Sequence, residues 1–413
     1  MRDHRLPSSP AFWRSPLRGP WFTSVLGVVL LVGITVLFVT GLLSYAAYNP
    51  DLSSVNDKTP GKGLLGFYLF SWPTHPSWLY RLTQGVHVTL GIALIPVLLA
   101  KLWSVVPKLF ALPPARSLAH ALERLSLLLL VGGALFEFTT GVLNVQLDYI
   151  FPGSFYPLHF YGAWVFFAAF LAHAVLKTPL ALRNLRHIRD EQPSGEGELV
   201  SPNPADPTVS RRGALGVVGG GSLLLLATTA GRSFDGPLRE TAVLAPHGGP
   251  EPGGGPGGFQ INKTAAYAGI SPTETGEEAW RLVVTGRDGR SVRLDRPQLL
   301  QLALHSSALP IACVEGWSTS DQWWRGVRLR DLAALVGHDD PVDVLVESLQ
   351  RHGAFRRAAL RANQVADPRS LLALFVNGED LTPDHGYPAR VIVPAAPGVL
   401  NTKWVARMTF GDL

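Results

Sequence analysis

The stretch Leu309-Pro310-Ile311-Ala312-Cys313-Val314-Glu315-Gly316-Trp317-Ser318 sets the fold of the C-terminal part, and it holds the only cysteine among 413 residues. A lone cysteine cannot close an intrachain disulfide, and it excludes a Cys-x-x-Cys metal site. Free cysteine is often a small buried hydrophobe, but its thiolate is also a soft ligand for a transition metal. Gly316 and Trp317 predict a tight turn against an aromatic wall. On these residues alone both interpretations of Cys313 stay open.

More distant residues extend this pattern in a fixed order. Trp324-Arg325-Gly326-Val327 and the segment 329–332 follow the cysteine loop. A second group closes the chain: Asn377-Gly378-Glu379, Asp384-His385-Gly386-Tyr387-Pro388-Ala389-Arg390, Val393-Pro394, Gly398 and Lys403-Trp404-Val405. With these two ordered motifs, residues 259–413 resemble the sulfite oxidase superfamily of molybdopterin enzymes. The resemblance is closest to the bacterial branch that contains the methionine sulfoxide reductases.

The resemblance implies roles for residues of both motifs. Cys313 is expected to ligate molybdenum that molybdopterin holds. His385, Arg390 and Lys403 match pterin-binding positions, and the arginine fork suits phosphate and pterin oxygens. Asn262, in the segment that enters the domain, is a further candidate for the cofactor.

The substrate-contacting residue is less clearly marked. Arg325, next to Trp324 and shortly after the metal loop, is the first candidate. Three other arginines compete with it: Arg351, Arg356 and Arg361. The segment 347–370 departs from both branches of the superfamily, so the substrate itself stays open.

Strands and short helices mix without a regular βαβ rhythm in the C-terminal part, which predicts an α+β domain. The expected strands are 282–284, 342–346 and 390–394, and 329–336 is expected to be a short helix. The length suffices for the molybdopterin domain alone and leaves no room for the immunoglobulin-like dimerisation domain of eukaryotic sulfite oxidases.

The composition indicates a membrane protein. Hydrophobic residues make up 47% and charged residues 16% of the chain, which is too apolar for an ordinary soluble protein of this length. The net charge of +5 does not indicate nucleic-acid binding, because the basic residues gather at the ends of apolar segments. Such a distribution is explained by membrane topology.

Four apolar runs are each long enough to span a bilayer. The connection between the second and third runs and the segment after the fourth are rich in lysine and arginine, whereas the connections near 48–82 and 146–156 are poorer in them. The positive-inside rule therefore places both ends of the four-helix unit in the cytoplasm and residues 1–20 with them. The runs are 21–47, 83–106, 122–145 and 157–182.

A shorter apolar run, 214–231, follows Ser210-Arg211-Arg212-Gly213. It is either a plain fifth membrane helix with a basic inner flank or an internal twin-arginine export signal. The second interpretation is favoured because the run is Gly-rich and precedes a domain that needs its cofactor before export. The expected division of the chain is thus a four-helix cytochrome b-like domain (21–182), a cytoplasmic linker (183–213), the fifth helix, a flexible Gly/Pro-rich tether (232–258) and the oxidoreductase domain (259–413).

Histidines in the apolar runs suggest haem, because ionisable residues in membrane spans are costly. His87 and His159 lie at matching depths near the outer ends of the second and fourth runs, so they could bind one b-type haem. His173 follows His159 by 14 residues, about 21 Å along a helix, a spacing similar to that of two-haem cytochromes b. Its natural partner would be His120, although Lys101 stands where a second deep histidine is expected. Alternatively, these histidines cap helices or bond to carbonyls.

Glu137 is the other costly residue of the apolar runs. It could carry protons, border a quinone site or pair with a histidine. These alternatives are not separated by the sequence.

Together these features predict a molybdenum oxidoreductase in the bacterial plasma membrane, with its catalytic domain outside. It would transfer an oxygen atom on a small sulfur-containing substrate, exchange electrons with the quinone pool through haem and depend on the twin-arginine machinery. The alternatives are an oxidase of sulfite or another sulfur oxyanion, and a non-catalytic electron-transfer protein.

Overall fold

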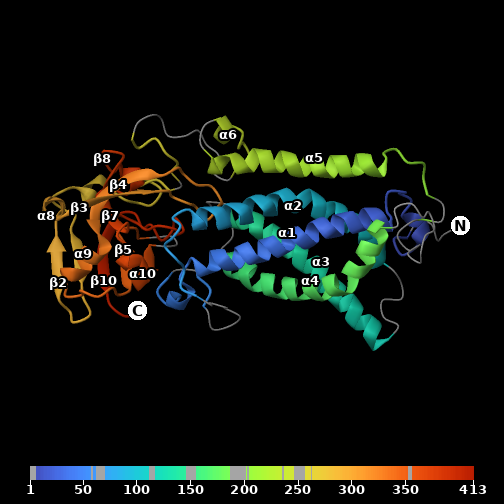
Figure 1. The fold of residues 1–413 in the computed structure, drawn as a ribbon, viewed down its shortest axis with the longest axis horizontal. Helices are drawn as coiled ribbons and strands as arrows, with labels where there is room; N and C mark the ends of the chain where they lie inside the picture. The colour runs from blue at the N-terminus through green and yellow to red at the C-terminus, as the bar shows by residue number, and fades with distance from the viewer. Residues whose placement is uncertain are drawn as a thin grey trace. The chain divides into compact units, whose positions relative to one another are not determined.

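The computed structural model describes residues 6–56, 59–61, 70–110, 117–145, 155–186, 201, 204–234, 237–245, 256–261, 263–351 and 356–413. Five long helices come first: α1 (Pro20–Ala46), α2 (Leu79–Leu109), α3 (Leu118–Asn144), α4 (Phe155–Arg186) and α5 (Arg211–Ala230) (Figure 1). Each coincides with one of the apolar runs. Within the described ranges, five helices are long and apolar enough to cross a membrane.

The chain divides into two compact units. Unit 1 consists of Met1–Val39, Thr89–Leu143 and Leu158–Ala227. Unit 2 consists of Thr40–Val88, Asn144–Pro157 and Thr228–Leu413. Unit 2 therefore contains the end of α1, the start of α2 and the whole C-terminal domain.

In unit 1 the helices pack through large apolar side chains. The buried cluster takes residues from α1, α2, α3 and α4, and α5 adds partly buried side chains to it. The helices are apolar around most of their circumference, which is typical of helices surrounded by lipid. The cluster consists of Phe22, Leu26, Leu30, Ile34, Leu94, Val97, Leu98, Ala134, Phe166 and Phe170.

The C-terminal domain is α+β, as predicted. One sheet has the order β2-β1-β10-β5-β6, in which β1 and β10 are parallel. The other has the order β3-β4-β7-β8, with β9 paired to β7. The strands are β1 (Leu282–Thr285), β2 (Ser291–Leu294), β3 (Leu304–Leu309), β4 (Gln322–Arg328), β5 (Val344–Ser348), β6 (Arg357–Leu360), β7 (Leu371–Val376), β8 (Glu379–Asp380), β9 (Arg390–Ile392) and β10 (Val405–Phe410).

The other helical elements are short, and they lie before or between these strands in the chain. They are α6 (Pro237–Glu240), α7 (Pro272–Thr275), α8 (Arg296–Gln301), α9 (Leu329–Ala334) and α10 (Ala362–Ala366), with the 3-10 turns η2 (Pro10–Phe12), η3 (Pro50–Leu52), η4 (Gly231–Ser233) and η5 (Pro383–His385). The predicted strands correspond to β1, β5 and β9, and the predicted helix to α9.

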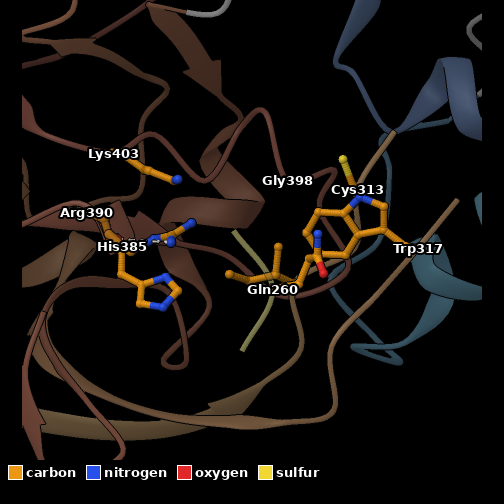
Figure 2. A pocket seen from close by; sticks show the side chains of 8 residues that line it. Gln260, Cys313, Trp317, His385, Arg390, Gly398 and Lys403 are labelled. Atoms are coloured by element: carbon orange, nitrogen blue, oxygen red, sulfur yellow. Dashed lines mark hydrogen bonds between the residues drawn. The ribbon is translucent and has the colours of Figure 1, made fainter. Parts of the chain in front are cut away.

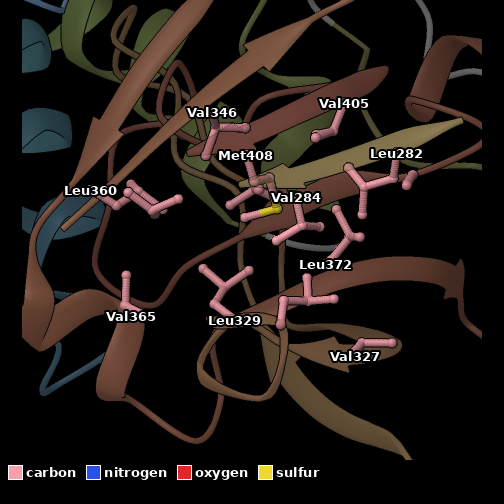
Figure 3. Close-up of a cluster of buried hydrophobic side chains, with 14 of the residues drawn as sticks. Leu282, Val284, Val327, Leu329, Val346, Leu360, Val365, Leu372, Val405 and Met408 are labelled. Carbon is pink, nitrogen blue, oxygen red and sulfur yellow. The ribbon is translucent and has the colours of Figure 1, made fainter. Parts of the chain in front are cut away.

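The main core of the C-terminal domain lies between the sheets (Figure 3). Leu282 and Val284 on β1, Met408 on β10 and Leu372 on β7 are fully buried and belong to one cluster. Leu329 on α9 belongs to the same cluster. Alternate residues of β1 are buried, as expected for a strand with one face on a core.

Residues before α2 are bonded to the C-terminal domain within unit 2. Asn49 Nδ2 donates to Gln364 Oε1 at 2.9 Å and to the Ala359 carbonyl at 3.1 Å. Trp72 Nε1 donates to the Ala395 carbonyl at 2.7 Å. Because Asn49 and Trp72 are buried, these bonds fix the two residues, which lie between α1 and α2 in the chain, to the domain.

Candidate functional site

The cysteine loop is a tight, backbone-bonded turn between β3 and β4. The Cys313 N–H donates to the Trp317 carbonyl at 2.9 Å, and the Gly316 N–H donates to the Cys313 carbonyl at 3.1 Å. Gly316 has φ +88°, a conformation that favours glycine. The predicted turn is therefore present. Cys313 is buried at 2% exposure, and none of these backbone bonds uses its thiol.

Glu315, for which the sequence suggested no role, is a buried carboxylate beside the thiol. It accepts a hydrogen bond from Trp317 Nε1 at 2.9 Å and another from the Cys313 side chain. Burial raises the pKa of Glu315 to about 7, and these two bonds oppose the rise. The surroundings of the thiol are thus unfavourable for added negative charge.

The closing motif brings three basic residues together. Gly386, at φ +108°, turns the chain after η5, and a Cβ built there would lie 3.1 Å from the Cβ atoms of Arg390 and Lys403. Arg390 donates to the carbonyls of His385 (3.1 Å) and Asn401 (3.2 Å). Lys403 Nζ donates to the carbonyls of Lys263 (2.7 Å) and Asp384 (2.8 Å). Close packing around Gly386 therefore sets the spacing of the three basic side chains.

Burial has a strong electrostatic effect on this group. It lowers the pKa of His385 to about 4 and that of Arg390 to about 9. It also lowers the pKa of Lys403 well below its ordinary value, and the nearby Arg390 adds to this. An anionic group would offset these costs, because opposite charge favours the protonated forms.

One pocket contains both motifs. It is lined by Gln260, Ile311, Cys313, Trp317, His385, Arg390, Gly398 and Lys403. Figure 2 shows Lys403, Arg390 and His385 at one end of this lining and Cys313 with Trp317 at the other. His385 is held in place by Phe259, whose ring stacks on it at 3.9 Å between centroids.

The lining fits an extended anionic cofactor that ends at a metal. The buried Nε of Arg390 has no hydrogen-bond partner among the described residues, so the guanidinium keeps a donor for a ligand. A soft thiol stands at the opposite end. The four residues Cys313, His385, Arg390 and Lys403 were all predicted, whereas Gln260 belongs to no motif that the sequence marked.

Two predicted residues are not among the described residues that line this pocket. Asn262 lies outside the described residues. Arg325 is exposed on β4, with its guanidinium 5.7 Å from the Phe375 ring centroid. Of its competitors, Arg351 is ion-paired with Glu274, and Arg361 is ion-paired with Asp343 at 2.9 Å. The described pocket therefore does not support a substrate contact by Arg325.

Residues 268–412 match the family model described as oxidoreductase molybdopterin binding domain. Mouse mitochondrial sulfite oxidase is 31% identical over 156 residues, covering 32% of this chain and 29% of its own length. The uncharacterized oxidoreductase YuiH of Bacillus subtilis is 30% identical over 131 residues. This match covers 32% of this chain and 65% of YuiH. The protein-methionine-sulfoxide reductase catalytic subunit MsrP of Gluconobacter oxydans is 31% identical over 151 residues. This match covers 32% of this chain and 47% of MsrP.

These matches identify the C-terminal part as a sulfite oxidase-type molybdopterin-binding domain and support an oxidoreductase with a molybdenum–molybdopterin cofactor. The chain spans less than two thirds of the length of each of these relatives. The long helices lie outside the residues that the family model matches.

Two histidines of the long helices, His87 and His159, have defined side-chain partners. In unit 1, His159 Nδ1 lies 3.1 Å from Glu137 Oε2 and 2.9 Å from Thr140 Oγ1. Thr140 donates its own proton to the Phe136 carbonyl at 2.8 Å, so its oxygen accepts from His159. This arrangement assigns the proton to Nδ1 and the lone pair to Nε2. Of the roles open for Glu137, pairing with a histidine is thus present.

In unit 2, His87 Nδ1 lies 3.2 Å from Thr40 Oγ1. Gly41 is adjacent: a Cβ built there would lie 3.1 Å from His87 Cε1. Similarly, a Cβ built on Gly141 would lie 3.4 Å from His159 Cε1. His120 lies at the start of α3, where its backbone N–H donates to Ser117 Oγ at 3.2 Å. His173 lies within α4, and its pairing with His120 stays a prediction.

Replacing Lys403 by methionine should separate cofactor binding from folding. In full-length protein from cells that make no molybdopterin, Lys403→Met is expected to raise the free energy of unfolding by about 1–2 kcal/mol, since apolar residues often replace buried charges favourably. In cells that make the cofactor, the same variant should retain at least about tenfold less molybdopterin. Thermal unfolding and pterin content are the measurements.

The stability of the cofactor-free protein should rise with pH because of Lys403. The folded protein binds the Lys403 proton less tightly than the unfolded chain, so raising the pH toward 10.5, the ordinary pKa of lysine, should stabilise the cofactor-free protein. Lys403→Met should lose this stabilisation. Arg407 on β10 forms an exposed ion pair with Glu347. Arg407→Met is the matched control and should change neither the free energy of unfolding nor the pterin content. A Lys403→Met protein with normal pterin content would contradict the assignment.

Proposed function

We propose that this chain is a membrane-bound molybdenum oxidoreductase that removes an oxygen atom from a small sulfoxide on the outer side of a bacterial plasma membrane. Electrons would come from quinol through a b-type haem. The observation that carries the proposal is the shared pocket of Cys313 and the three basic residues His385, Arg390 and Lys403.

Each residue has a role that its position supports. When bound, the molybdenum cofactor supplies two-electron oxygen-atom transfer. Cys313 would bind the metal through its thiolate. Arg390 and Lys403 would bind the anionic pterin and phosphate oxygens, since both are buried or partly buried cations. Asn262 and Gln260 are further candidates for contact with the pterin.

The charge at the metal end favours a neutral substrate. Ile311 and Trp317 line the pocket beside Cys313, and Glu315 adds a buried carboxyl group bonded to the thiol. Arginine is absent from that end of the described lining (Figure 2). Sulfite, as a dianion, would require positive charge there, whereas a sulfoxide would not. This favours a sulfoxide over sulfite or another sulfur oxyanion.

The bonds of Asn49 and Trp72 support the proposed side of the membrane. The connection 48–82 is expected outside by its charge. It is hydrogen-bonded to the C-terminal domain through Asn49–Gln364 and Trp72–Ala395. Two bonded segments must lie on the same side, so the domain would also lie outside.

The surroundings of two histidines support a haem. A metal-bound histidine commonly donates its other ring N–H to a carboxylate or hydroxyl, and His159 is bonded in this way to Glu137 and Thr140. His87 stands similarly beside Thr40. We therefore propose His87 and His159 as the ligands of one haem, with His173 and His120 as candidates for a second.

Export of the domain gives a separate prediction. Because the folded domain must carry its cofactor across the membrane, Arg211 and Arg212 at the start of α5 are proposed as a twin-arginine signal. Arg211→Lys with Arg212→Lys keeps the charge, so the positive-inside rule alone predicts no change. We expect the double variant to keep the C-terminal domain inside.

Protease access from the outer face of spheroplasts measures this. Arg183→Lys with Arg186→Lys, at the end of α4, is the matched control and should leave the domain accessible. If the domain of the Arg211/Arg212 variant is cleaved as readily as that of the wild type, α5 is only an anchor.

A substrate panel tests the chemistry. Membranes containing the protein should reduce alkyl aryl sulfoxides and methionine sulfoxide with a quinol analogue as donor. Sulfite with a quinone analogue as acceptor should give a much lower rate. The reverse order of rates would establish the oxyanion oxidase instead, and purified protein without molybdenum would indicate a non-catalytic protein.

A further inference from the structure

The loop of Cys313 is held by side chains from outside the family-matched domain, all within unit 2. Gln84 Nε2 on α2 donates to the Val314 carbonyl. Ser233 Oγ, at the end of η4, donates to the Gly316 carbonyl at 3.0 Å. Arg239 Nη1 on α6 donates to the Ser318 carbonyl at 3.3 Å. The carbonyls of Val314, Gly316 and Ser318 thus all accept hydrogen bonds from residues that precede the C-terminal domain.

The contact with α2 is close as well as hydrogen-bonded. A Cβ built on Gly316 would lie 2.7 Å from Val88 Cβ, so only glycine allows this approach. Arg81, one turn before Gln84, donates to the Ser233 carbonyl. The outer turn of α2 therefore lies directly against the metal loop.

The same turn of α2 carries His87. Gln84 and His87 are three residues apart, which places them on one helix face about 4.5 Å apart along the axis. Two bonds tie this face to α1: Ser44 Oγ donates to Gln84 Oε1 at 2.7 Å, and Thr40 Oγ1 lies 3.2 Å from His87 Nδ1. A third pair continues the series just beyond the end of α1, with 3.4 Å between the hydroxyls of Tyr48 and Tyr80. These three pairs hold the two helices in one register.

We infer that Gln84 is a positioning residue that couples the haem on His87 to the metal loop. It holds the carbonyl next to Cys313 in a fixed place relative to His87, so electrons cross without movement of the C-terminal domain. This inference rests on the proposed function. Removing one oxygen atom from a sulfoxide consumes two electrons and two protons and releases water. Quinol supplies the two electrons, which pass singly from the His87 side to the Cys313 side.

Gln84→Met tests the inference in the full-length protein, because methionine keeps the length of the side chain and loses the amide. Gln84→Glu is a second variant, which keeps the acceptor for Ser44 and loses the donor for Val314. Thr83→Val is the matched control on the same turn, since its hydroxyl donates within its own helix to the Tyr80 carbonyl at 3.3 Å.

Two readouts are needed. Hydrogen exchange of the Cys313 and Gly316 amides should accelerate about five- to tenfold in both Gln84 variants, the effect expected for loss of one hydrogen bond. After reduction of the haem, its reoxidation by an alkyl aryl sulfoxide should slow at least about tenfold, because small misplacements have large kinetic effects. Haem and molybdenum contents should equal those of the wild type.

The outcomes separate the inference from the proposed function. If both Gln84 variants behave like Thr83→Val while the wild-type haem is reoxidised by sulfoxide, the inference is wrong and the proposed function stands. If the wild-type protein contains no haem, or sulfoxide does not reoxidise it, both are overturned.

Discussion

Cys313→Ala is expected to lower sulfoxide reduction at least about 100-fold, since loss of even an outer partner of a metal costs about 10–100-fold. Cys313 is the only thiol in the chain, so no other cysteine can replace it as a ligand. The backbone bonds that shape its loop do not use the thiol, and the fold should persist. Activity and molybdenum content are the measurements.

The proposed haem, measured in the same sample, serves as the internal control for this variant. Its reduced-minus-oxidised spectrum should be unchanged, because the proposed haem ligands lie on α2 and α4. Full turnover by Cys313→Ala would contradict the assignment of the metal ligand. Loss of both activity and haem would indicate misfolding, and Cys313→Ser would then be measured in its place.

Replacement of His87 or His159 by alanine is expected to remove a low-spin b-type absorbance, with a loss of about one haem per chain. Each residue would supply one axial ligand, so either change should suffice. Glu137→Gln should retain the haem and shift its midpoint potential upward, because the carboxylate that increases the basicity of His159 is lost.

Difference spectra and redox titration in membranes measure these effects. His338→Ala is the control, since His338 lies in the C-terminal domain and accepts a hydrogen bond from the Arg287 backbone at 3.1 Å. Unchanged spectra in both the His87 and His159 variants would exclude this pair. An effect of His173→Ala alone would show that the ligands were paired incorrectly.

The long helices could be predicted from sequence because their signal is local. A run of apolar residues long enough to span a bilayer forms a helix whatever its partners, since unpaired backbone groups are costly in lipid. The short strands are different. Among the described strands, β3 pairs with β4 alone and obtains its register from it. β8 has two exposed residues paired with β7. Neither carries an apolar pattern that would mark it in advance.

The site shows the same contrast. Cys313, Arg390, His385 and Lys403 have distinctive chemistry in ordered motifs, and the structure brings them together. Arg325 follows Trp324 directly in sequence, and its contact with substrate stays a prediction. On β4, neighbouring residues point to opposite faces: Trp324 is buried beside Arg390, whereas Arg325 is exposed.

Contacts between distant segments could not be predicted. Gln84 and Val314 are 230 residues apart, and no local pattern connects a glutamine in an apolar helix to a carbonyl in a loop. Glu315 was visible in the cysteine motif, but its burial against the thiol depends on how the loop folds. Such features appear only when the tertiary structure places the partners.

Metal and haem analysis of the purified full-length protein tests the central claim most directly. The account predicts about one molybdenum and at least one b-type haem per chain, and oxidation of the reduced haem when a sulfoxide is added. Haem without molybdenum, or molybdenum with a haem that sulfoxide cannot oxidise, would contradict it.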